Sequence, residues 1–438
     1  MRLICRRTKS FEGEIRVGGD KSISHRGAML SSIAKGESEI ENFNTCRDCL
    51  STLRCLRSLG VEWELEGRKV WIKGGELKEP ENILNAGNSG TTIRLLSGIL
   101  SAHPFLSIIT GDSSLRRRPM DRIKEPLEMM GARILARANR FPPLAIWGGN
   151  LRGIEYRLPV ASAQVKSAIL LAGLFAEGKT IVHEPFPSRD HTERMLSFMG
   201  VKLESKDEGV SVEGGANLSP LKLIVPGDFS ASAFFIALAL LTRSRLMIRD
   251  VGLNPTRIGM LDVLRNMGAN IKVMNIREEA NEPIGDIEVM GGELEGTLIE
   301  KNIPMMIDEL PILAILGAKA KGITELRNAE ELRYKETDRI RALATGLRRM
   351  GVEVEERRDG MLIKGGVTRG AVINSFGDHR IAMAFAVLGL ASEGETVIRN
   401  AQCVDISFPD FYTLAKSLVG DAIQRNEKEE KWIGKPTR

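Results

Sequence analysis

The stretch Gly18-Gly19-Asp20-Lys21-Ser22-Ile23-Ser24-His25-Arg26 joins a strand-like segment to a helix-like one. The preceding Glu14-Ile15-Arg16-Val17 alternates polar and apolar residues, and Gly27-Ala28-Met29-Leu30 opens the helical pattern. Glycines let a ligand approach the backbone, a helix start offers free N–H groups, and Lys and Arg add positive charge. The stretch therefore fits an anion-binding loop, although an ordinary turn with a helix cap and surface charges fits it equally well.

The double glycine of this stretch recurs along the chain and indicates a repeated unit. The later pairs are Gly74-Gly75, Gly148-Gly149, Gly214-Gly215, Gly291-Gly292 and Gly365-Gly366. Each later pair follows a short strand-like run, and upstream of each run a glycine ends an amphipathic segment; these helix stops are Gly60, Gly131, Gly200, Gly268 and Gly351. A period of about 70 residues is too long for a solenoid repeat, so we predict a small α/β unit used six times.

The sixth copy predicts how the chain is divided into domains. Gly420 is a sixth helix stop with no strand and double glycine after it, whereas an unmatched strand and double glycine stand at Ile15–Gly19. We therefore expect the N-terminal strand to complete the last unit. The chain would leave this domain near Gly19 and return at Val225-Pro226-Gly227-Asp228, where Pro-Gly marks a turn, and the two adjacent connections would form a hinge. The predicted domains are 19–226, inserted, and 1–18 plus 227–438, with 421–438 as a charged, frayed tail.

Length and composition are those of a soluble protein with two or more domains. The 438 residues are 42% hydrophobic and 27% charged, and this length exceeds one ordinary core. No apolar run reaches membrane-spanning length and the start lacks the apolar core of a signal peptide, so we expect a cytoplasmic protein with no membrane partner. The net charge of +5 suits an anionic small ligand as well as nucleic acid.

The cysteines and the Asp190-His191 pair do not predict a metal site. Five cysteines are an odd number, which argues against a disulfide framework. Cys46 and Cys49 form a CxxC motif with Cys55 further along the same predicted helix, but no second pair of zinc ligands lies at a suitable spacing. Asp190 and His191 also lack the spacing of a metal motif, and helix capping explains the Asp. We therefore expect no metal site.

Three further polar stretches lie in the predicted inserted domain. Asn85–Thr92 is a Gly- and Asn-rich loop leading into a helix; it suits phosphate or carboxylate, and a polar capping turn fits it too. Leu115–Pro119 contains three consecutive arginines without the interleaved aromatic residues of a nucleic-acid surface. Ser162–Ser167 begins another helix, for which simple N-capping is the alternative explanation.

Two helix starts in the second half also carry charge. Asp308 and Glu309 precede an apolar helix, where acids are favourable for the helix dipole. Gly377-Asp378-His379-Arg380 opens a later helix and brings a His and an Arg together.

The segment Glu331–Arg339 is rich in charged residues of both signs. Its pattern predicts a helix that places Lys335 and Arg339 on one face with Glu336 beside them. Neighbouring cations would lower the pKa of Glu336 and burial would raise it, so the carboxyl group could both give and take a proton near neutral pH. A solvated, charged helix explains the same pattern.

If both domains present their helix starts to one cleft, that cleft attracts anions. The cations near these starts are Lys21, Arg26, Arg118, Arg189, Lys335, Arg339 and Arg380. Closure of two domains around a polyanionic substrate follows from such a layout.

Taken in order, seven motifs of this chain resemble those of the EPSP synthase family of enolpyruvyl transferases, and the resemblance extends to about Leu418. The motifs are Gly19–Arg26, Gly87–Thr92, Arg117–Met120, Ser162–Ser167, Ser188–Glu193, Arg333–Arg339 and Gly377–Arg380. The family fold is a two-domain inside-out α/β barrel of six βαβαββ repeats, three per domain, which agrees with the six copies inferred above.

The resemblance implies a transferase reaction on two anionic substrates. The enolpyruvyl (carboxyvinyl) group of phosphoenolpyruvate would pass to the 5-hydroxyl of shikimate 3-phosphate, a step towards chorismate and the aromatic amino acids. Phosphate would leave by addition and elimination through a tetrahedral intermediate, without a metal or organic cofactor. The implied partners are these two substrates and no nucleic acid, with glyphosate as a candidate inhibitor, and we expect a monomer.

The resemblance also implies site residues, position by position. Shikimate 3-phosphate would be held by Lys21, Ser22, Arg26, Ser162, Ala163, Gln164, Arg189, Asp308 and Lys335. Phosphoenolpyruvate would be surrounded by Lys21, Gly90, Arg118, Gln164, Glu336, Arg339, His379 and Arg380. Asp308 would take the proton of the 5-hydroxyl, and Glu336, with Lys21 close by, would move the proton at the methylene carbon. These roles suit the chemistry, because arginines pair bidentately with carboxylate and phosphate and carboxylates transfer protons.

Two positions depart from the family pattern. Ala163 stands where many relatives have a second Ser, so one phosphate contact is missing, and Lys166 or Arg189 is the candidate replacement. Ile406, ahead of Ser407-Phe408-Pro409, stands where some relatives have a Lys. One cation of the phosphoenolpyruvate site is therefore missing.

Two other functions remain open at this point. UDP-N-acetylglucosamine enolpyruvyl transferase shares the fold but has a reactive cysteine loop and an early Lys-Asn pair. In this chain Lys21 is followed by Ser22, and no Cys lies between Arg116 and Pro119. A nucleic-acid-binding protein would use the basic clusters instead. An assay with phosphoenolpyruvate and shikimate 3-phosphate separates the three functions.

Overall fold

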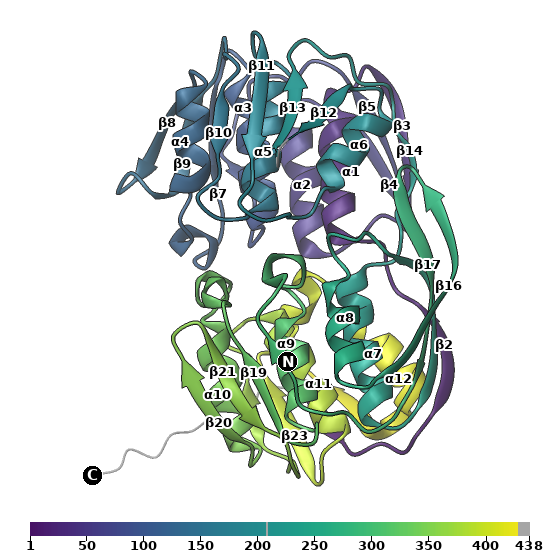
Figure 1. Ribbon diagram of the computed structural model, residues 1–438. Coiled ribbons are helices and arrows are strands. Elements are labelled where there is room, and N and C mark those ends of the chain that lie inside the picture. Colours follow the sequence, from purple (N-terminus) through teal and green to yellow (C-terminus); the bar gives the residue numbers. More distant parts are fainter. Residues whose placement is uncertain (207–208, 428–438) are drawn as a thin grey trace.

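The computed structural model describes residues 1–206 and 209–427, and its architecture is a repeated α/β unit (Figure 1). Within these residues there are six four-stranded sheets, and in each the first two strands are parallel and the other two pairs of neighbours antiparallel. Three sheets are β14(Lys222–Ile224)-β3(Gly36–Glu41)-β5(Lys69–Gly74)-β4(Glu62–Glu66), β6(Leu84–Asn85)-β7(Leu106–Thr110)-β9(Phe141–Trp147)-β8(Arg133–Arg137) and β10(Glu155–Arg157)-β11(Lys179–His183)-β13(Gly209–Glu213)-β12(Leu203–Lys206). The other three are β2(Glu12–Arg16)-β15(Arg245–Gly252)-β17(Glu282–Met290)-β16(Asn270–Glu279), β18(Leu298–Ile299)-β19(Ile323–Leu326)-β21(Gly360–Lys364)-β20(Glu353–Arg357) and β22(Val372–Asn374)-β23(Glu395–Arg399)-β1(Arg2–Arg6)-β24(Ile423–Asn426).

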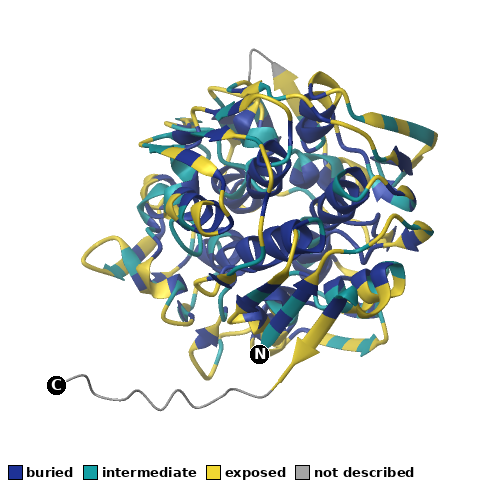
Figure 2. Ribbon diagram, turned by 90° about the horizontal axis from the view of Figure 1, so that it is seen from below, coloured by how far each residue is buried: buried dark blue, intermediate teal, exposed yellow. Residues whose placement is uncertain are grey.

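Each sheet is associated with two helices of different character. One helix of each unit is buried on nearly all sides; these are α1(Lys21–Ile33), α3(Gly90–Ser101), α5(Ala163–Gly173), α7(Phe229–Leu241), α9(Leu310–Gly317) and α11(His379–Leu390). The second helix keeps an exposed face; these are α2(Arg47–Ser58), α4(Asp121–Met129), α6(His191–Phe198), α8(Gly259–Asn266), α10(Arg339–Arg349) and α12(Phe411–Val419). A helix that is apolar all round must lie inside a core, which puts the first set at the centre. Figure 2 shows these buried helices inside a rim of strands with exposed residues.

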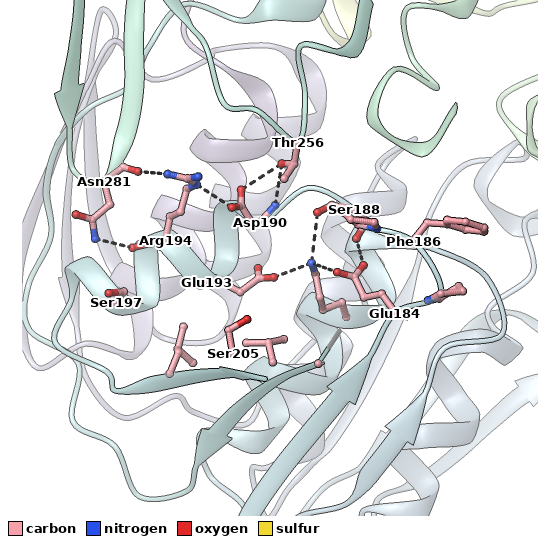
Figure 3. Close-up of a pocket in the computed structure, with 16 residues that line it drawn as sticks. Glu184, Phe186, Ser188, Asp190, Glu193, Arg194, Ser197, Ser205, Thr256 and Asn281 are labelled. Atoms are coloured by element: carbon pink, nitrogen blue, oxygen red, sulfur yellow. Dashed lines mark hydrogen bonds and ion pairs between the residues drawn. The ribbon is translucent and has the colours of Figure 1, made fainter. Parts of the chain in front are cut away.

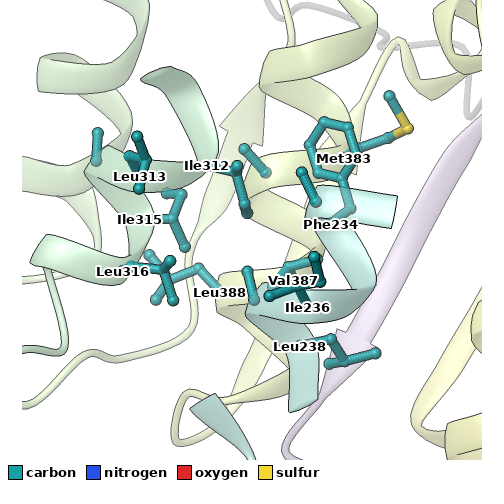
Figure 4. Packing of buried hydrophobic residues seen from close by; sticks show 14 of the residues in the cluster. Phe234, Ile236, Leu238, Ile312, Leu313, Ile315, Leu316, Met383, Val387 and Leu388 are labelled. Atoms are coloured by element: carbon teal, nitrogen blue, oxygen red, sulfur yellow. The ribbon is translucent and has the colours of Figure 1, made fainter. Parts of the chain in front are cut away.

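The hydrophobic cores are two, one for each half of the molecule. In the described residues, buried apolar side chains from Ile23 to Val225 form one cluster. The second cluster joins Leu3, Cys5, Ile15 and Val17 to the apolar side chains from Phe229 to Ile423. Figure 4 shows part of it, where α7, α9 and α11 pack side by side through residues such as Phe234, Ile312 and Met383. We call residues 19–226 the inserted half and residues 1–18 with 227–427 the terminal half.

The two halves are connected where the chain crosses between them. Gly19 and Gly227 form a β-bridge, and the amide of Asp20 donates to the Pro226 carbonyl at 2.7 Å. No larger residue fits at position 19, because a Cβ there would lie 1.9 Å from the Asn42 carbonyl oxygen. The junction expected at Val225–Asp228 is therefore where the structure has one, and α7 begins directly after it.

A buried arginine ties the two crossings together. Arg257 lies 3.1 Å from a carboxylate oxygen of Asp20, which caps α1, and 3.1 Å from one of Asp228, which caps α7. Burial acts to raise the pKa of Asp20, but Arg257 and the capping bonds lower it to about 2. One cation thus fixes the first turns of two helices from opposite halves.

The predicted helix stops and pre-glycine strands are confirmed. Strands β5, β9, β13, β17 and β21 each end at or just before the expected double glycine. The five stop glycines have positive φ, from 81° at Gly268 to 117° at Gly131. The left-handed conformation explains the glycine, since side chains with a Cβ rarely adopt it.

The assignment of the N-terminal strand was wrong. The strand before Gly18-Gly19, β2, pairs in parallel with β15 and so completes the first sheet of the terminal half. The last sheet is completed by β1, which pairs antiparallel with β23 and with β24. The chain after Gly420 therefore does form a strand, at Ile423–Asn426, and the predicted frayed tail is wrong for these residues. Residues 428–438 of that tail lie outside the described part of the chain.

Two further features bear on the sequence analysis. Among the described residues, no helix is long and apolar enough to cross a membrane. The five cysteines are free and buried, and burial raises the pKa of Cys5, Cys55 and Cys403 to about 12. Thiols of this kind are unreactive, which favours a packing role.

Candidate active site

The buried helices of both halves begin at the boundary between the halves. The helix that follows the opening stretch starts at Lys21, six residues earlier than expected, and the Lys21 amide donates to Asp228 of the other half at 3.1 Å. The first turns of α3, α9 and α11 contribute further residues to the same region, as the contacts below show. Helix N-termini carry free N–H groups and partial positive charge, so their convergence creates an anion-binding region.

Asp308, just before α9, is the centre of one group of charges. Its carboxylate lies 2.6 Å from Arg189 Nη2, 3.3 Å from Arg380 Nε and 3.5 Å from Arg339 Nη1. Arg189 belongs to the inserted half and the other two arginines to the terminal half. Burial acts to raise the pKa of Asp308, but the surrounding cations, Arg380 first among them, hold it well below its usual range. Asp308 is therefore a carboxylate at neutral pH in this structure.

Glu336 is the centre of a second group. Its carboxylate lies 2.6 Å from Arg339 Nη2 and 3.5 Å from Arg118 Nη1, again one cation from each half. Arg339 also donates to Asp378 at 2.8 Å, which links this group to the start of α11. Burial acts to raise the pKa of Glu336, but Arg339 and Arg118 hold it well below its usual range. In this structure, therefore, burial and the neighbouring cations do not balance to give Glu336 a pKa near neutral pH, as the sequence had led us to expect.

The backbone around Glu336 also differs from the expectation. Glu330–Tyr334 is a short 3-10 helix, Lys335 has extended backbone angles, and α10 begins only at Arg339. Lys335 and Glu336 thus lie on a loop, and the predicted continuous helix face is wrong. Asp338 ends the loop by capping α10, since its side chain accepts from the Arg341 amide at 3.0 Å.

Lys21 and His379 lie beside these two groups. Lys21 Nζ is 3.0 Å from Asp48 Oδ2 on α2. Burial acts to raise the pKa of Asp48, and this effect outweighs the nearby Lys21. His379 is buried, neither ring nitrogen has a hydrogen-bond partner among the described residues, and burial holds its pKa well below the usual value. A neutral imidazole with unused polar atoms is thus available to a ligand.

Gln164 and Gly90 lie on the inserted half of the same region. Gln164 accepts from Arg94 Nη1 at 2.6 Å and donates to Thr91 Oγ1 at 3.0 Å. A Cβ at Gly90 would lie 2.9 Å from Arg94 Nη1 and 3.3 Å from Arg118 Nη1. The glycine therefore leaves space in front of two guanidinium groups.

A cavity of about 700 Å³ opens next to these residues, between the halves. Asn88, Arg117 and Arg118 line it from the inserted half. From the terminal half come Lys335, Glu336, Gly377 and Ile406, the last with no charge to offer. Arg47 also lines it and lies 3.3 Å from Asp405. Only Arg118 of the three consecutive arginines is buried, which separates it from a merely solvated basic cluster.

Some predicted residues are held within the inserted half. Arg26 is buried and donates to Thr192 at 2.7 Å, Ser167 at 2.9 Å and the Ser22 carbonyl at 3.1 Å. Lys166 lies 2.6 Å from Glu184 and 2.6 Å from Glu193. Both cations are thus bound to groups of the inserted half, whereas the partner of Arg189 lies across the boundary. Ser162 caps α5, as expected.

Three residues at the site were missed by the sequence analysis. Asp48 was seen only as part of a CxxC motif, although an acid in a first helical turn was a usable signal. Arg94 lies one turn after Gly90 on α3, where i,i+4 spacing places it on the same face. Asn88 accepts from Arg118 Nη2 at 2.7 Å and so helps to fix the side chain of Arg118.

Comparison with known proteins gives one consistent result. The sequence model of the family described as EPSP synthase (3-phosphoshikimate 1-carboxyvinyltransferase) matches residues 5–414. The 3-phosphoshikimate 1-carboxyvinyltransferase of Alkaliphilus metalliredigens is 51% identical over 424 residues, which are 95% of this chain and 100% of that protein. The enzyme of the same name from Thermodesulfovibrio yellowstonii is 49% identical over 428 residues, with 95% and 100% coverage. The solved EPSP synthase of Acinetobacter baumannii superposes with a TM-score of 0.86 at 43% identity, covering 97% of this chain and 99% of its own.

Proposed function

The chain belongs to the EPSP synthase family, and we propose that the region between its halves is the active site of that reaction. The chain is a transferase that passes the carboxyvinyl group of phosphoenolpyruvate to shikimate 3-phosphate in the shikimate pathway. The main support for this site is the ion pairing across the boundary between the halves. Arg189 reaches Asp308 and Arg118 reaches Glu336, so each acidic centre is completed only when the halves meet.

The two groups of charges suggest where each substrate binds. Arg189, Ser162, Gln164 and Lys335 would hold shikimate 3-phosphate, with its 5-hydroxyl directed at Asp308. Arg118, which lines the cavity, and Arg339, which pairs with the lining residue Glu336, carry guanidinium groups that suit the phosphate and carboxylate of phosphoenolpyruvate.

The carboxylates then supply two different proton transfers. Asp308, ionised among cations, accepts the proton of the 5-hydroxyl while the oxygen of that hydroxyl attacks C2 of phosphoenolpyruvate. A proton is added to the methylene carbon in the same phase and removed again when phosphate leaves, and Glu336 is the group placed for both steps. Lys21 and the helix N-termini stabilise the negative charge of the carboxylate and of the phosphate that leaves.

The pKa of Glu336 has to change for this role. In this structure its carboxylate holds Arg118 and Arg339, which are the cations assigned to phosphoenolpyruvate. Once substrate anions neutralise these cations, burial becomes the larger influence and the pKa of Glu336 rises. The group is then able to carry the proton that the addition step requires.

The activity is tested by supplying phosphoenolpyruvate with one of two acceptors. Purified protein should release phosphate with shikimate 3-phosphate and not with UDP-N-acetylglucosamine, because the residues assigned to the acceptor substrate suit a compact phosphorylated ring. Phosphate release only with the nucleotide sugar would overturn the proposal.

Arg118 gives a test of the phosphoenolpyruvate site. Arg118→Ala should weaken phosphoenolpyruvate binding by about 2 kcal/mol or more, the scale for a lost charged hydrogen-bond partner. The matched control is Arg116→Ala, because Arg116 is exposed two residues away on the same segment. Equal losses in a titration of both variants would mean that only diffuse charge matters.

The same geometry supports two mobile domains, 19–226 and 1–18 with 227–438. The halves have separate cores, and two ion pairs between them, Arg189–Asp308 and Arg118–Glu336, are largely buried, so closure without substrate pays a desolvation penalty. We expect shikimate 3-phosphate to compact the enzyme, as measured by small-angle scattering. An unchanged radius of gyration on adding the substrate together with glyphosate would contradict this.

Glyphosate is proposed as an inhibitor on chemical grounds. Its phosphonate and carboxylate are two anions of the kind that Arg118 and Arg339 would hold. The monomeric state and the cytoplasmic location stay predictions, and gel filtration tests the first.

A further inference from the structure

Arg189 lies between β11 and α6 on a loop that is fixed on both sides by polar networks. Figure 3 shows these networks around Ser188 and Asp190. The loop runs from the end of β11 to the start of α6, and together with Lys166 and Arg194 it lines a second cavity, of about 560 Å³. Ser188 precedes Arg189 and Asp190 follows it, and both neighbours have partners outside the loop. The position of Arg189 is therefore set by what these two residues contact.

The network on the Ser188 side belongs to the inserted half alone. Lys166 Nζ lies 2.6 Å from Glu184 and 2.6 Å from Glu193 and donates to the Ser188 carbonyl at 3.4 Å. Its side chain is only 2% exposed. This network anchors the loop to α5 and α6 whether or not the halves meet.

The network on the Asp190 side joins the two halves. Asn254 Nδ2 donates to Asp190 Oδ1 at 2.7 Å, and Thr256 Oγ1 donates to the same oxygen at 3.2 Å. The Asp190 amide in turn donates to Thr256 Oγ1 at 3.3 Å. Next to it, Arg194 Nη1 donates to the Asn281 carbonyl at 2.7 Å. Figure 3 shows Thr256 and Asn281 of the terminal half directly facing Asp190 and Arg194 of α6.

The carboxylate of Asp190 does not cap the helix that follows it. Asp190 stands at the N-cap position of α6, where an Asp normally accepts from the free amides of the first turn. Here its side chain makes no such bond. Both oxygens are used instead, one by Asn254 and Thr256 and the other by Arg194 Nε at 2.9 Å. Of these two contacts, the one with Asn254 and Thr256 joins the two halves.

We propose that docking of Asp190 on Asn254 and Thr256 positions Arg189 for shikimate 3-phosphate. Asp190, Asn254 and Thr256 are then positioning residues that couple closure to substrate binding. Consecutive Cα atoms are held about 3.8 Å apart, so fixing Asp190 against the terminal half fixes the backbone of Arg189 as well. Arg189 can then reach Asp308 from the opposite side of the boundary. The inference rests on the proposed function, because it takes Arg189 as a ligand of shikimate 3-phosphate.

The first test measures shikimate 3-phosphate binding by calorimetry on the full-length protein. Asp190→Ala should weaken binding about tenfold, the effect of losing one or two hydrogen bonds to a charged group. The control is Glu128→Ala, which removes the i,i+4 ion pair between Glu128 and Lys124 on α4. This pair has the same spacing as the pair of Asp190 with Arg194 but takes no part in the contacts proposed at the boundary. The control variant should leave binding unchanged. Asp190→Asn retains an acceptor for Asn254 and should restore binding to within about threefold of the native protein.

A double-mutant cycle decides whether the effect passes through Arg189. In an Arg189→Met background, Asp190→Ala should change affinity less than about twofold, because coupled residues are non-additive. A tenfold loss in both backgrounds, or none in the native background, overturns the proposal. If Asp190→Ala does not fold, Thr256→Val in the other half replaces it and should show the same dependence on Arg189. Turnover of the native protein is measured first. An inactive enzyme counts against the proposed function, whereas an additive cycle in an active enzyme counts against the docking contact alone.

Discussion

Glu336→Gln should lower turnover by roughly 10²-fold or more, the range for a lost general acid–base group. Gln keeps the shape of the side chain and an acceptor for Arg339 but cannot titrate. In the structure the pKa of Glu336 is depressed, so the carboxylate pairs with its arginines at neutral pH and releases them only as pH falls through that lowered pKa. The neutral amide should therefore leave the protein folded while removing the proton transfer at the methylene carbon.

The matched control for this variant is Glu331→Gln. Glu331 is on the preceding 3-10 helix and also pairs across the boundary, at 2.9 Å from Arg122, but it is more exposed and outside the two acidic centres. It should retain most of the turnover. Steady-state rates and shikimate 3-phosphate affinity are measured on both variants. Near-native turnover of Glu336→Gln would remove Glu336 from the mechanism, and loss of substrate binding with turnover would assign it a structural role.

Asp308→Asn should also lower turnover by roughly 10²-fold or more, because the attacking hydroxyl loses its base. Binding of shikimate 3-phosphate should not weaken to the same degree. Removing one negative charge from among Arg189, Arg339 and Arg380 leaves the site more attractive to an anionic substrate. The predicted signature is a fall in kcat with KM for shikimate 3-phosphate unchanged or lower.

Glu309→Gln is the control for Asp308. Glu309 is the next residue and is fully buried, but its carboxyl group faces Ser230 in the core, and burial raises its pKa. An amide in its place should be tolerated with little change in turnover. A rise in KM without a fall in kcat for Asp308→Asn would make Asp308 a binding group only.

The repeat and the helix starts were predictable because their signals are local. A glycine after an amphipathic run, as at Gly60 or Gly351, identifies a helix end without reference to the rest of the fold. The positive φ of both glycines in the structure is the physical reason for the signal. The same holds for Ser162 and Asp378, whose side chains cap the helices that follow them. Strand pairing is not local. Strands β1 and β2 are both short and are connected within a few residues, and only packing decides which sheet receives each.

The arrangement of the site also depended on tertiary contacts. Nothing in the sequence near Lys21 pointed to Asp48, because the two residues meet through the packing of α1 against α2. The charges of Glu331–Arg339 have helical spacing, but Arg122 pairs with Glu331 on the 3-10 helix and Arg118 with Glu336 on the loop, so contacts across the boundary accompany a path that is not one α-helix. Conversely, Arg26 has the composition of a ligand residue and is used inside the inserted half.

We propose that this chain transfers the carboxyvinyl group by addition and elimination in the cavity between its halves. The direct measurement is the reaction of the purified protein with phosphoenolpyruvate and shikimate 3-phosphate in deuterium oxide, followed by NMR of the product. We predict deuterium at the methylene carbon of the transferred group, one phosphate released per product, and loss of both in Glu336→Gln. A product formed at the native rate with no deuterium at that carbon would contradict the account.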